Sequence, residues 1–396
     1  MTQSIEKFKL SSGGLLYRLL IFFRAQKLED YCIRRRIVLF SALTFLPLLL
    51  LSAYEGNLIN KDFALSFASD FKSSVRFLIV LPLLIVADTV IDPLIVAIMR
   101  NISFSGILSD SGKGILERNF SVLVRRKNSV FIDIGILIIA LVLVLIGYEK
   151  SSSIYFSGSQ STWAAITDGD QYHITLAGWW FLMVSHPVLQ ILLYRWIWRF
   201  LIWVEFMFRV SRIKFELEPS HPDLAGGLGI LGYSQNAFVI IFVAIGSLVS
   251  LSLAQEILYT DASVAMIKAV VPAFVGASLI ITTVPLLFFS RQLFLAKMNG
   301  RVAYGALGYK LSRAFGEKWL RGGDSESGRS LLETADSSTV CDYSTVYEFV
   351  RTMRVIPVSL RTYAMQAVLL GLPFGPLVFL KLRFTDLLSG LFDALL

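Results

Sequence analysis

Three aspartates, Asp88, Asp92 and Asp133, lie inside strongly apolar runs of the sequence. Asp88 and Asp92 are four residues apart, so on a helix they share one face. An ionised carboxylate at bilayer depth costs about 2.5–3.5 kcal/mol, so such groups usually face a water-filled path or a paired cation. One interpretation is an acidic path for a cation or a proton. The other pairs the aspartates with Arg195, Arg199 or another loop arginine.

A histidine, His186, precedes Pro187 midway through another apolar run. The proline is expected to kink its helix, and the simplest role for the imidazole is a hydrogen bond to a freed backbone carbonyl. With an unperturbed pKa of about 6.5, the imidazole is also suited to gate a path by taking a proton. We therefore place His186 with the three aspartates as a candidate pathway residue.

Two arginines, Arg195 and Arg199, follow at helical spacing and are surrounded by Trp196, Trp198 and Trp203. An interfacial aromatic belt, with arginine side chains that reach towards water, explains this pattern. The alternative is an arginine ring at the inner mouth of a pore, which would select anions or hold lipid phosphate. Both interpretations place the arginines at a membrane boundary.

A polar, glycine-rich turn comes next, after an alternating stretch over 213–218 that predicts a short strand. Its candidate entrance residues are His221, Asp223, Gly226, Gly227 and Gly229. The spacing G-x-G-x-x-G also occurs here, but a dinucleotide site needs a βαβ unit of about 30 residues, and the next apolar run starts too soon. Tight backbone turns or close helix packing explain the glycines better.

Composition indicates which elements carry these residues. The 396-residue chain is 55% hydrophobic and 17% charged, against about 25% charged residues in soluble domains. The net charge of +8 is explained by basic cytoplasmic loops rather than by nucleic-acid binding. The two cysteines and three histidines form no metal-binding pattern, and we expect no metal and no cofactor.

The apolar runs predict an all-α polytopic membrane protein with six transmembrane helices and cytoplasmic amphipathic helices. A basic N-terminal segment, 1–36, precedes them and contains a surface helix near 15–23. The transmembrane domain, 37–290, is expected to contain spans at 37–53, 77–99, 130–147, 174–194, 237–258 and 267–290.

Two further segments complete the chain. Residues 291–362 predict a cytoplasmic helical segment that is flexible over 322–343. Residues 363–396 hold a seventh apolar run, interrupted by glycines and prolines, and an amphipathic tail. The seventh run either crosses the membrane or forms a re-entrant hairpin. The distribution of Lys and Arg among the loops places the N-terminus in the cytoplasm and the protein in the plasma (inner) membrane.

Three functions fit these features. The first is an oligomeric ion channel or channel-like permease. Asp88, Asp92, Asp133 and His186 would lie along its path, and Arg195, Arg199 and the glycine-rich turn would form its cytoplasmic entrance. The second is a membrane scaffold or sensor that recruits a cytoplasmic partner. The third is a membrane-surface, lipid-modifying enzyme that would use His221 and Asp223, although no nucleophile motif such as G-x-S-x-G accompanies them. The first is the leading hypothesis; an enzyme is the least favoured.

Overall fold

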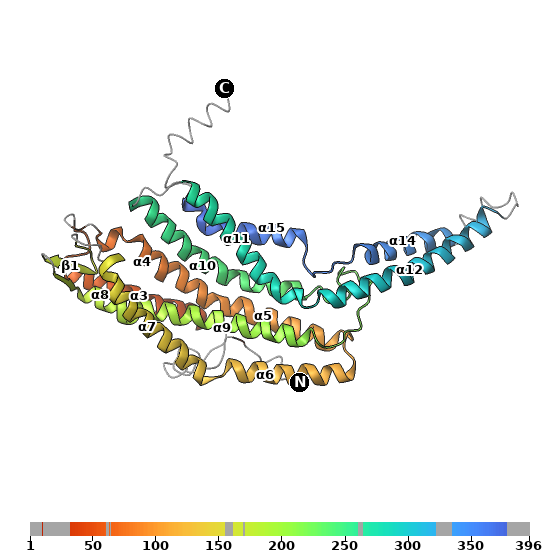
Figure 1. The fold of residues 1–396 in the computed structure, drawn as a ribbon, viewed down its shortest axis with the longest axis horizontal. Helices are drawn as coiled ribbons and strands as arrows, with labels where there is room; N and C mark the ends of the chain where they lie inside the picture. Colours follow the sequence, from red (N-terminus) through yellow and green to blue (C-terminus); the bar gives the residue numbers. More distant parts are fainter. Residues whose placement is uncertain are drawn as a thin grey trace, which may run out of the picture.

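In a computed structural model, the structure describes residues 10, 32–60, 63, 65–154, 161–168, 171–259, 264–321 and 335–377. Most of them form long helices (Figure 1). By length and composition, five helical stretches can cross a membrane, and a sixth is added if the bent pair α6 and α7 counts as one span. The architecture fits an all-α membrane protein with several spans, as the sequence predicted.

The first four apolar runs form two similar helical hairpins. One consists of α3 (Cys32–Tyr54) and a returning helix built from α4 (Phe71–Val75), the π-helical turn η2 (Arg76–Val80) and α5 (Leu81–Phe104). The other consists of α7 (Val130–Ile154) and a returning helix built from α8 (Leu176–Trp180), the π-helical turn η3 (Phe181–Ser185) and α9 (His186–Val210).

The two returning helices share their local design. Each starts from a side-chain cap, Asp70 or Thr175, and passes through five α-helical and five π-helical residues. Each then enters its long helix with a proline in the first turn, Pro82 or Pro187. A proline lacks the N–H that an interior helical position needs, and the wider π turn accommodates that loss. The sequence predicted a kink at Pro187, and the structure has a π-helical turn, Phe181–Ser185, directly before this proline.

The remaining helices complete the bundle and an arm. The helix α6 (Asp110–Lys127) joins the two hairpins, and α10 (Leu231–Tyr259) packs extensively along α5. The helix α11 (Val264–Leu287) returns beside α10. The helices α12 (Ser290–Trp319) and α14 (Asp336–Thr352) lie side by side and project beyond the bundle (Figure 1).

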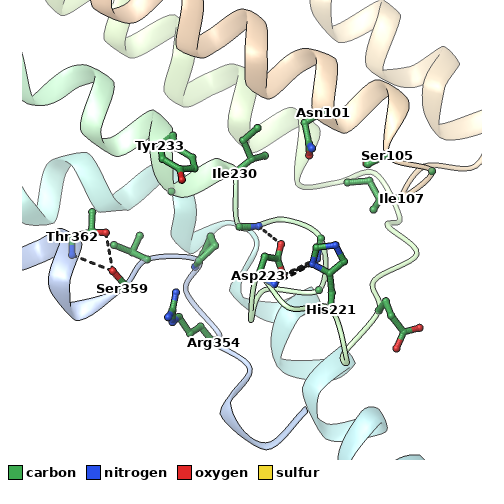
Figure 2. A pocket seen from close by; sticks show the side chains of 18 of the residues that line it. Asn101, Ser105, Ile107, His221, Asp223, Ile230, Tyr233, Arg354, Ser359 and Thr362 are labelled. Carbon is green, nitrogen blue, oxygen red and sulfur yellow. Dashed lines mark hydrogen bonds and ion pairs between the residues drawn. The ribbon is translucent and has the colours of Figure 1, made fainter. Parts of the chain in front are cut away.

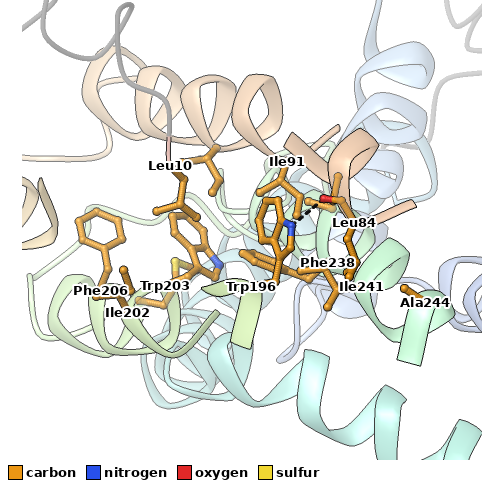
Figure 3. Packing of buried hydrophobic residues seen from close by; sticks show 14 of the residues in the cluster. Leu10, Leu84, Ile91, Trp196, Ile202, Trp203, Phe206, Phe238, Ile241 and Ala244 are labelled. Carbon is orange, nitrogen blue, oxygen red and sulfur yellow. Dashed lines mark hydrogen bonds between the residues drawn. The ribbon is translucent and has the colours of Figure 1, made fainter. Parts of the chain in front are cut away.

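The centre of the bundle is aromatic (Figure 3). Trp196 and Trp203 of α9 are almost completely buried, and Trp203 stacks on Phe206 with ring centroids 5.5 Å apart. The indole N–H of Trp196 donates to the backbone carbonyl of Leu84 on α5 at 2.7 Å. A buried tryptophan needs such a partner for its N–H, so this bond fixes α9 against α5.

The seventh apolar run forms α15 (Leu360–Gly371), the short 3₁₀ turn η4 (Leu372–Phe374) and a further turn to Leu377. Gln366 bonds Asn236 near the start of α10. Phe374 then packs on Phe274 of α11, with ring centroids 5.5 Å apart, and Leu377 packs with Leu253 towards the other end of α10. The run therefore follows α10 along most of its length.

Several local expectations differ from the structure. The loop after α7 contains an antiparallel hairpin of β1 (Ala165–Asp168) and β2 (Gln171–Ile174), which the all-α prediction did not include. The strand predicted over 213–218 is wrong, because only Phe215 forms a bridge, to Leu108. The helix α9 continues to Val210, well beyond the expected end of the fourth span. The helix α14 begins inside the segment predicted to be flexible, whereas the surface helix near 15–23 lies outside the described residues.

Candidate functional site

A cavity of about 640 Å³ lies at one end of the bundle, which we call the loop end (Figure 2). The loop end comprises the last turn of α5 and the residues after it, the loop 213–230, the start of α10 and the segment 353–362 that leads into α15. The volume falls within the roughly 300–1,000 Å³ that is typical of small-molecule sites. All five predicted entrance residues of the glycine-rich turn line it: His221, Asp223, Gly226, Gly227 and Gly229.

Asp223 organises the loop that forms one wall. Its Oδ1 accepts hydrogen bonds from the backbone N–H groups of Ala225 at 2.8 Å and Gly227 at 3.2 Å, and its Oδ2 accepts from Gly229 at 2.8 Å. Partial burial raises the pKa of Asp223, but the three backbone hydrogen bonds outweigh burial and hold the pKa below its ordinary value. The carboxylate thus occupies the concave ring of amides that a phosphate would need, which explains why the glycine pattern makes no nucleotide site.

The glycines of the turn are required by its backbone. Gly226 and Gly227 have φ angles of 62° and 95°, and the preceding Leu224 also has a positive φ of 57°. Residues with a side chain rarely adopt this region. At Gly229, a Cβ atom would come within 2.9 Å of the Asp223 side chain. Both explanations offered from the sequence, tight turns and close approach, therefore apply.

His221 stands beside this carboxylate at the cavity wall. Its Nδ1 lies 3.2 Å from the backbone N of Asp223 and 2.9 Å from Oδ1 of the same residue. A single ring nitrogen cannot serve both groups in one state. An unprotonated Nδ1 accepts from the backbone N–H, whereas a protonated Nδ1 donates to the carboxylate, so the two contacts require different positions of the imidazole proton.

The segment 353–362 forms the facing wall. The backbone N–H of Arg354 donates to the carbonyl of Leu224 at 2.7 Å, which ties this segment to the glycine-rich turn. The guanidinium of Arg354 lines the cavity and makes no hydrogen bond or ion pair with any residue that the structure describes. Ser359 caps α15 by accepting from the N–H of Thr362 at 3.1 Å.

The cavity wall carries more negative than positive side chains. Glu216, Glu218 and Asp223 line it, against the single guanidinium of Arg354. The hydroxyl of Tyr304 donates to Glu218 at 2.8 Å, and this bond lowers the pKa of Glu218. Glu218 and Asp223 are therefore ionised at neutral pH, and the cavity attracts cations.

The predicted pathway residues lie elsewhere. Asp88 on α5 lies between two arginines, and its side chain is 11% exposed: Oδ2 accepts from Arg36 of α3 at 2.8 Å, and Oδ1 accepts from Arg199 of α9 at 3.2 Å. The guanidinium of Arg199 also lies over the ring of Trp196, 4.6 Å from its centroid. One carboxylate thus joins three helices through charge-assisted bonds.

The other two aspartates are also close to cations. Asp133 on α7 lies 3.7 Å from Nε of Arg195 on α9, and the two side chains are 11% and 9% exposed. Asp92 is buried and interacts electrostatically with Lys127 at the end of α6. We call these seven side chains the ionic network: Arg36, Asp88, Asp92, Lys127, Asp133, Arg195 and Arg199.

His186 is not part of this network. Its ring stacks on Phe181 with centroids 5.6 Å apart, and its Nδ1 is buried without a hydrogen-bond partner among the described residues. Arg195 and Arg199 likewise do not line the cavity, although the sequence placed them at its mouth. The structure brings together the five turn residues, and it groups both arginines with the aspartates.

Sequence reasoning missed several cavity residues. Arg354, Asn101, Asn236 and Thr362 are distant from the glycine-rich turn in the chain, and their residue types are common. A signal was present for Asn101 and Asn236, because each is an amide at the end of an apolar run. For Arg354, one of many basic residues in a long polar segment, the sequence holds no such signal.

The fold and the site define a multi-pass helical membrane protein with an electronegative cavity at one end of its bundle. Comparison of the chain with protein-family models, curated protein sequences and solved structures gives no match. The function is therefore argued from the site itself.

We predict that Asp223→Asn lowers the free energy of unfolding at pH 7 by about 1–3 kcal/mol, because an amide has only one acceptor oxygen and cannot accept from all three backbone N–H groups of the turn. Because the pKa of Asp223 is lowered in the folded state, its ionised form contributes stability above the unfolded value of about 3.9. That contribution is lost as the pH falls through the folded pKa.

Thermal unfolding of the purified protein in detergent, measured from pH 3 to pH 7, checks this prediction. The gap between the native protein and Asp223→Asn should narrow as the pH falls below about 4. The exposed Asp342→Asn is the control. A gap that stays constant across this range would contradict the role given to the ionised carboxylate.

We predict that Asp88→Asn lowers the free energy of unfolding by about 3–5 kcal/mol, because two guanidiniums whose side chains are only 11% and 10% exposed lose their shared counter-ion. Asp110→Asn is the matched control: Asp110 pairs with Lys113 at 2.8 Å but is fully exposed, so a measurable loss is not expected. Adding Arg199→Gln to Asp88→Asn should recover part of the loss in thermal unfolding. Equal losses for Asp88→Asn and Asp110→Asn would show that the network is not structural.

Proposed function

We propose that the chain is a channel-like permease for ions and that the cavity is its cytoplasmic entrance. The observation that carries this proposal is the continuity of polar side chains beyond the cavity. Asn236 and Thr362 line the cavity, and directly behind them Gln366 of α15 donates to Asn236 Oδ1 at 2.5 Å. Gln366 is completely buried among apolar helices, where isolated polar groups are costly and usually mark a pathway.

The finer topology is part of the same proposal. We place six spans in the membrane, with α7 as the third, and put the loop end in the cytoplasm. Support comes from the charges: the segments at the loop end, such as α6 and α12, are rich in Lys and Arg, whereas the loops at the other end are poor in them. The seventh run follows α10 as far as Leu377, so we propose that it crosses as well.

The ionic network limits where a path can run. An ion cannot use Asp88 while Arg36 and Arg199 occupy both of its oxygens. We therefore propose that the network braces α3, α5, α7 and α9, and that ions pass on the other side of α5, beside α10, α11 and α15. A path along the aspartates remains the competing version, in which opening would require the ion pairs to separate.

A second candidate is a scaffold or sensor that recruits a cytoplasmic partner. The arm of α12 and α14 favours it, because apolar side chains of α12 such as Val302, Leu307 and Tyr309 are largely exposed on it. Exposed apolar surface of this kind often marks a contact with another protein. The expected homo-oligomer is one such contact and stays a prediction.

The crossing of the seventh run predicts opposite locations for two positions. A single cysteine introduced at Lys381 should react with a membrane-impermeant thiol reagent added outside intact cells. A single cysteine at Gly305, on the arm, should react only after permeabilisation. Both variants should start from a chain in which Cys32 and Cys341 are replaced by serine. Labelling of both positions from the same side would support a re-entrant hairpin instead.

The permease proposal predicts ion flux into liposomes that contain the purified protein. Asn101→Leu should reduce this flux at least tenfold, because Asn101 lines the cavity and its buried Oδ1 has no partner among the described residues. The exposed Asn299→Leu on the arm is the control. The double variant Asp88→Asn with Arg199→Gln should conduct normally. It removes one ion pair of the ionic network, and the proposed path does not use that pair.

Each outcome of the flux assay is informative. If the double variant Asp88→Asn with Arg199→Gln remains folded but shows no flux, the path along the aspartates is favoured. No flux from the native protein would overturn the permease proposal. If a stoichiometric partner then co-purifies and is released by deletion of residues 300–350, the scaffold becomes the better account.

A further inference from the structure

Six polar side chains form a strip between α10, α11 and α15, one layer inside the cavity. We call them the amide strip: Gln235, Asn236, Thr282, Thr283, Tyr363 and Gln366. Gln235 is 1% exposed and Gln366 is 0% exposed. The amide nitrogen of Gln235 donates to the hydroxyl oxygen of Thr283 at 2.8 Å and approaches that of Thr282 at 3.4 Å. These bonds tie α10 to α11.

Several donors of the amide strip have acceptors in the structure. The hydroxyl of Thr283 donates to the carbonyl of Leu279 at 2.6 Å, and that of Thr282 donates to the carbonyl of Ser278 at 2.9 Å. The hydroxyl of Tyr363 lies 3.2 Å from that of Thr283. Since the Thr283 proton is already directed to Leu279, Tyr363 is the donor in this pair. The amide nitrogen of Gln366 donates to Asn236.

Two strong acceptors remain. The amide oxygens of Gln235 and Gln366 are both buried and accept no hydrogen bond from any described residue. A buried carbonyl oxygen without a donor is unfavourable, because it has lost its contacts with water. The two unpaired carbonyl oxygens present negative partial charge. A bound cation would supply the missing partner of such an oxygen.

The surroundings of the strip favour the same ligand. The cavity that leads to it carries three carboxylates and one guanidinium, which raises the local concentration of cations. The strip itself contains only neutral oxygens. Protein sites for Ca²⁺ and Mg²⁺ rely on carboxylates, whereas carbonyl and hydroxyl oxygens replace the hydration shell of monovalent ions in channels and transporters.

We propose that the amide strip binds a monovalent alkali-metal cation, with the amide oxygens of Gln235 and Gln366 as ligands. The inference rests on the proposed permease function and names its permeant class. The strip is the first dehydrated site behind the electronegative cavity, and it selects cations by neutral oxygens rather than by the aspartates of the ionic network.

Binding is tested on the purified protein in detergent, without any flux measurement. Thermal unfolding is recorded at equal ionic strength in KCl, in NaCl and in N-methyl-D-glucamine chloride, whose cation is too large for the strip. A ligand that binds only the folded state raises the unfolding temperature with concentration. We expect KCl or NaCl to raise it above the value in the organic salt, with a saturable dependence on concentration.

Substitutions locate the site. Gln235→Met and Gln366→Met keep the length of the side chain but remove the amide oxygen, and each should weaken the cation dependence at least tenfold. Gln190→Met is the matched control, because Gln190 lies on α9 and its Oε1 is also buried without a described partner. Gln235→Glu, which keeps the shape and adds a charge, should strengthen cation binding even if the methionine variants fold poorly.

The outcomes separate this inference from the permease itself. A native protein whose unfolding temperature is equal in all three salts overturns the cation site. An unchanged cation dependence in Gln235→Met and Gln366→Met also overturns it. Flux without cation-dependent stability leaves the permease standing and refutes the site. Cation-dependent stability that is lost in both methionine variants supports the site even if liposomes show no flux.

Discussion

The structure depends on how charge is accommodated among apolar helices. A carboxylate buried without a partner would cost several kilocalories per mole, and three carboxylates lie on the apolar helices α5 and α7. Asp88 holds Arg36 and Arg199 at the same time, and Asp133 lies close to Arg195. Because each arginine comes from another helix than its aspartate, neutralising the charge also fixes the relative positions of α3, α5, α7 and α9.

The other half of the bundle is held together differently. Between α10, α11 and α15 the described polar contacts are neutral amide and hydroxyl bonds, such as those of Gln235 with Thr283 and of Gln366 with Asn236. Neutral hydrogen bonds are weaker than charge-assisted ones and are more easily exchanged with water or a ligand. The bundle thus combines an ion-paired side with a side whose polar groups can change partners, and the cavity opens on the second side.

Much of this arrangement could be predicted from the sequence, but not all of it. Long apolar runs specify membrane helices because hydrocarbon offers the backbone no other hydrogen-bond partner, and the structure confirms a multi-span helical protein. The turn around Asp223 was recognisable because positive φ angles demand glycine at Gly226 and Gly227. Apolar runs and turn glycines depend only on neighbouring residues, so both can be recognised in a single sequence.

Pairing across helices is not local, and there the sequence left alternatives open. Four-residue spacing showed that Arg195 and Arg199 share a helix face, but only the packing of α9 against α5 and α7 decides that they turn inwards to aspartates. For the same reason Gln235 and Gln366, separated by most of the C-terminal half of the chain, gave no sign of a common site.

The two kinds of buried polar group have different physical consequences. In the ionic network each described charge lies near an opposite charge, so the protein itself neutralises its carboxylates. In the amide strip two buried carbonyl oxygens accept no hydrogen bond from a described residue, so a ligand that enters can satisfy them. A site that the fold leaves incomplete is where a ligand changes the free energy most. The ion-paired residues of the ionic network are better understood as the structural support of that site.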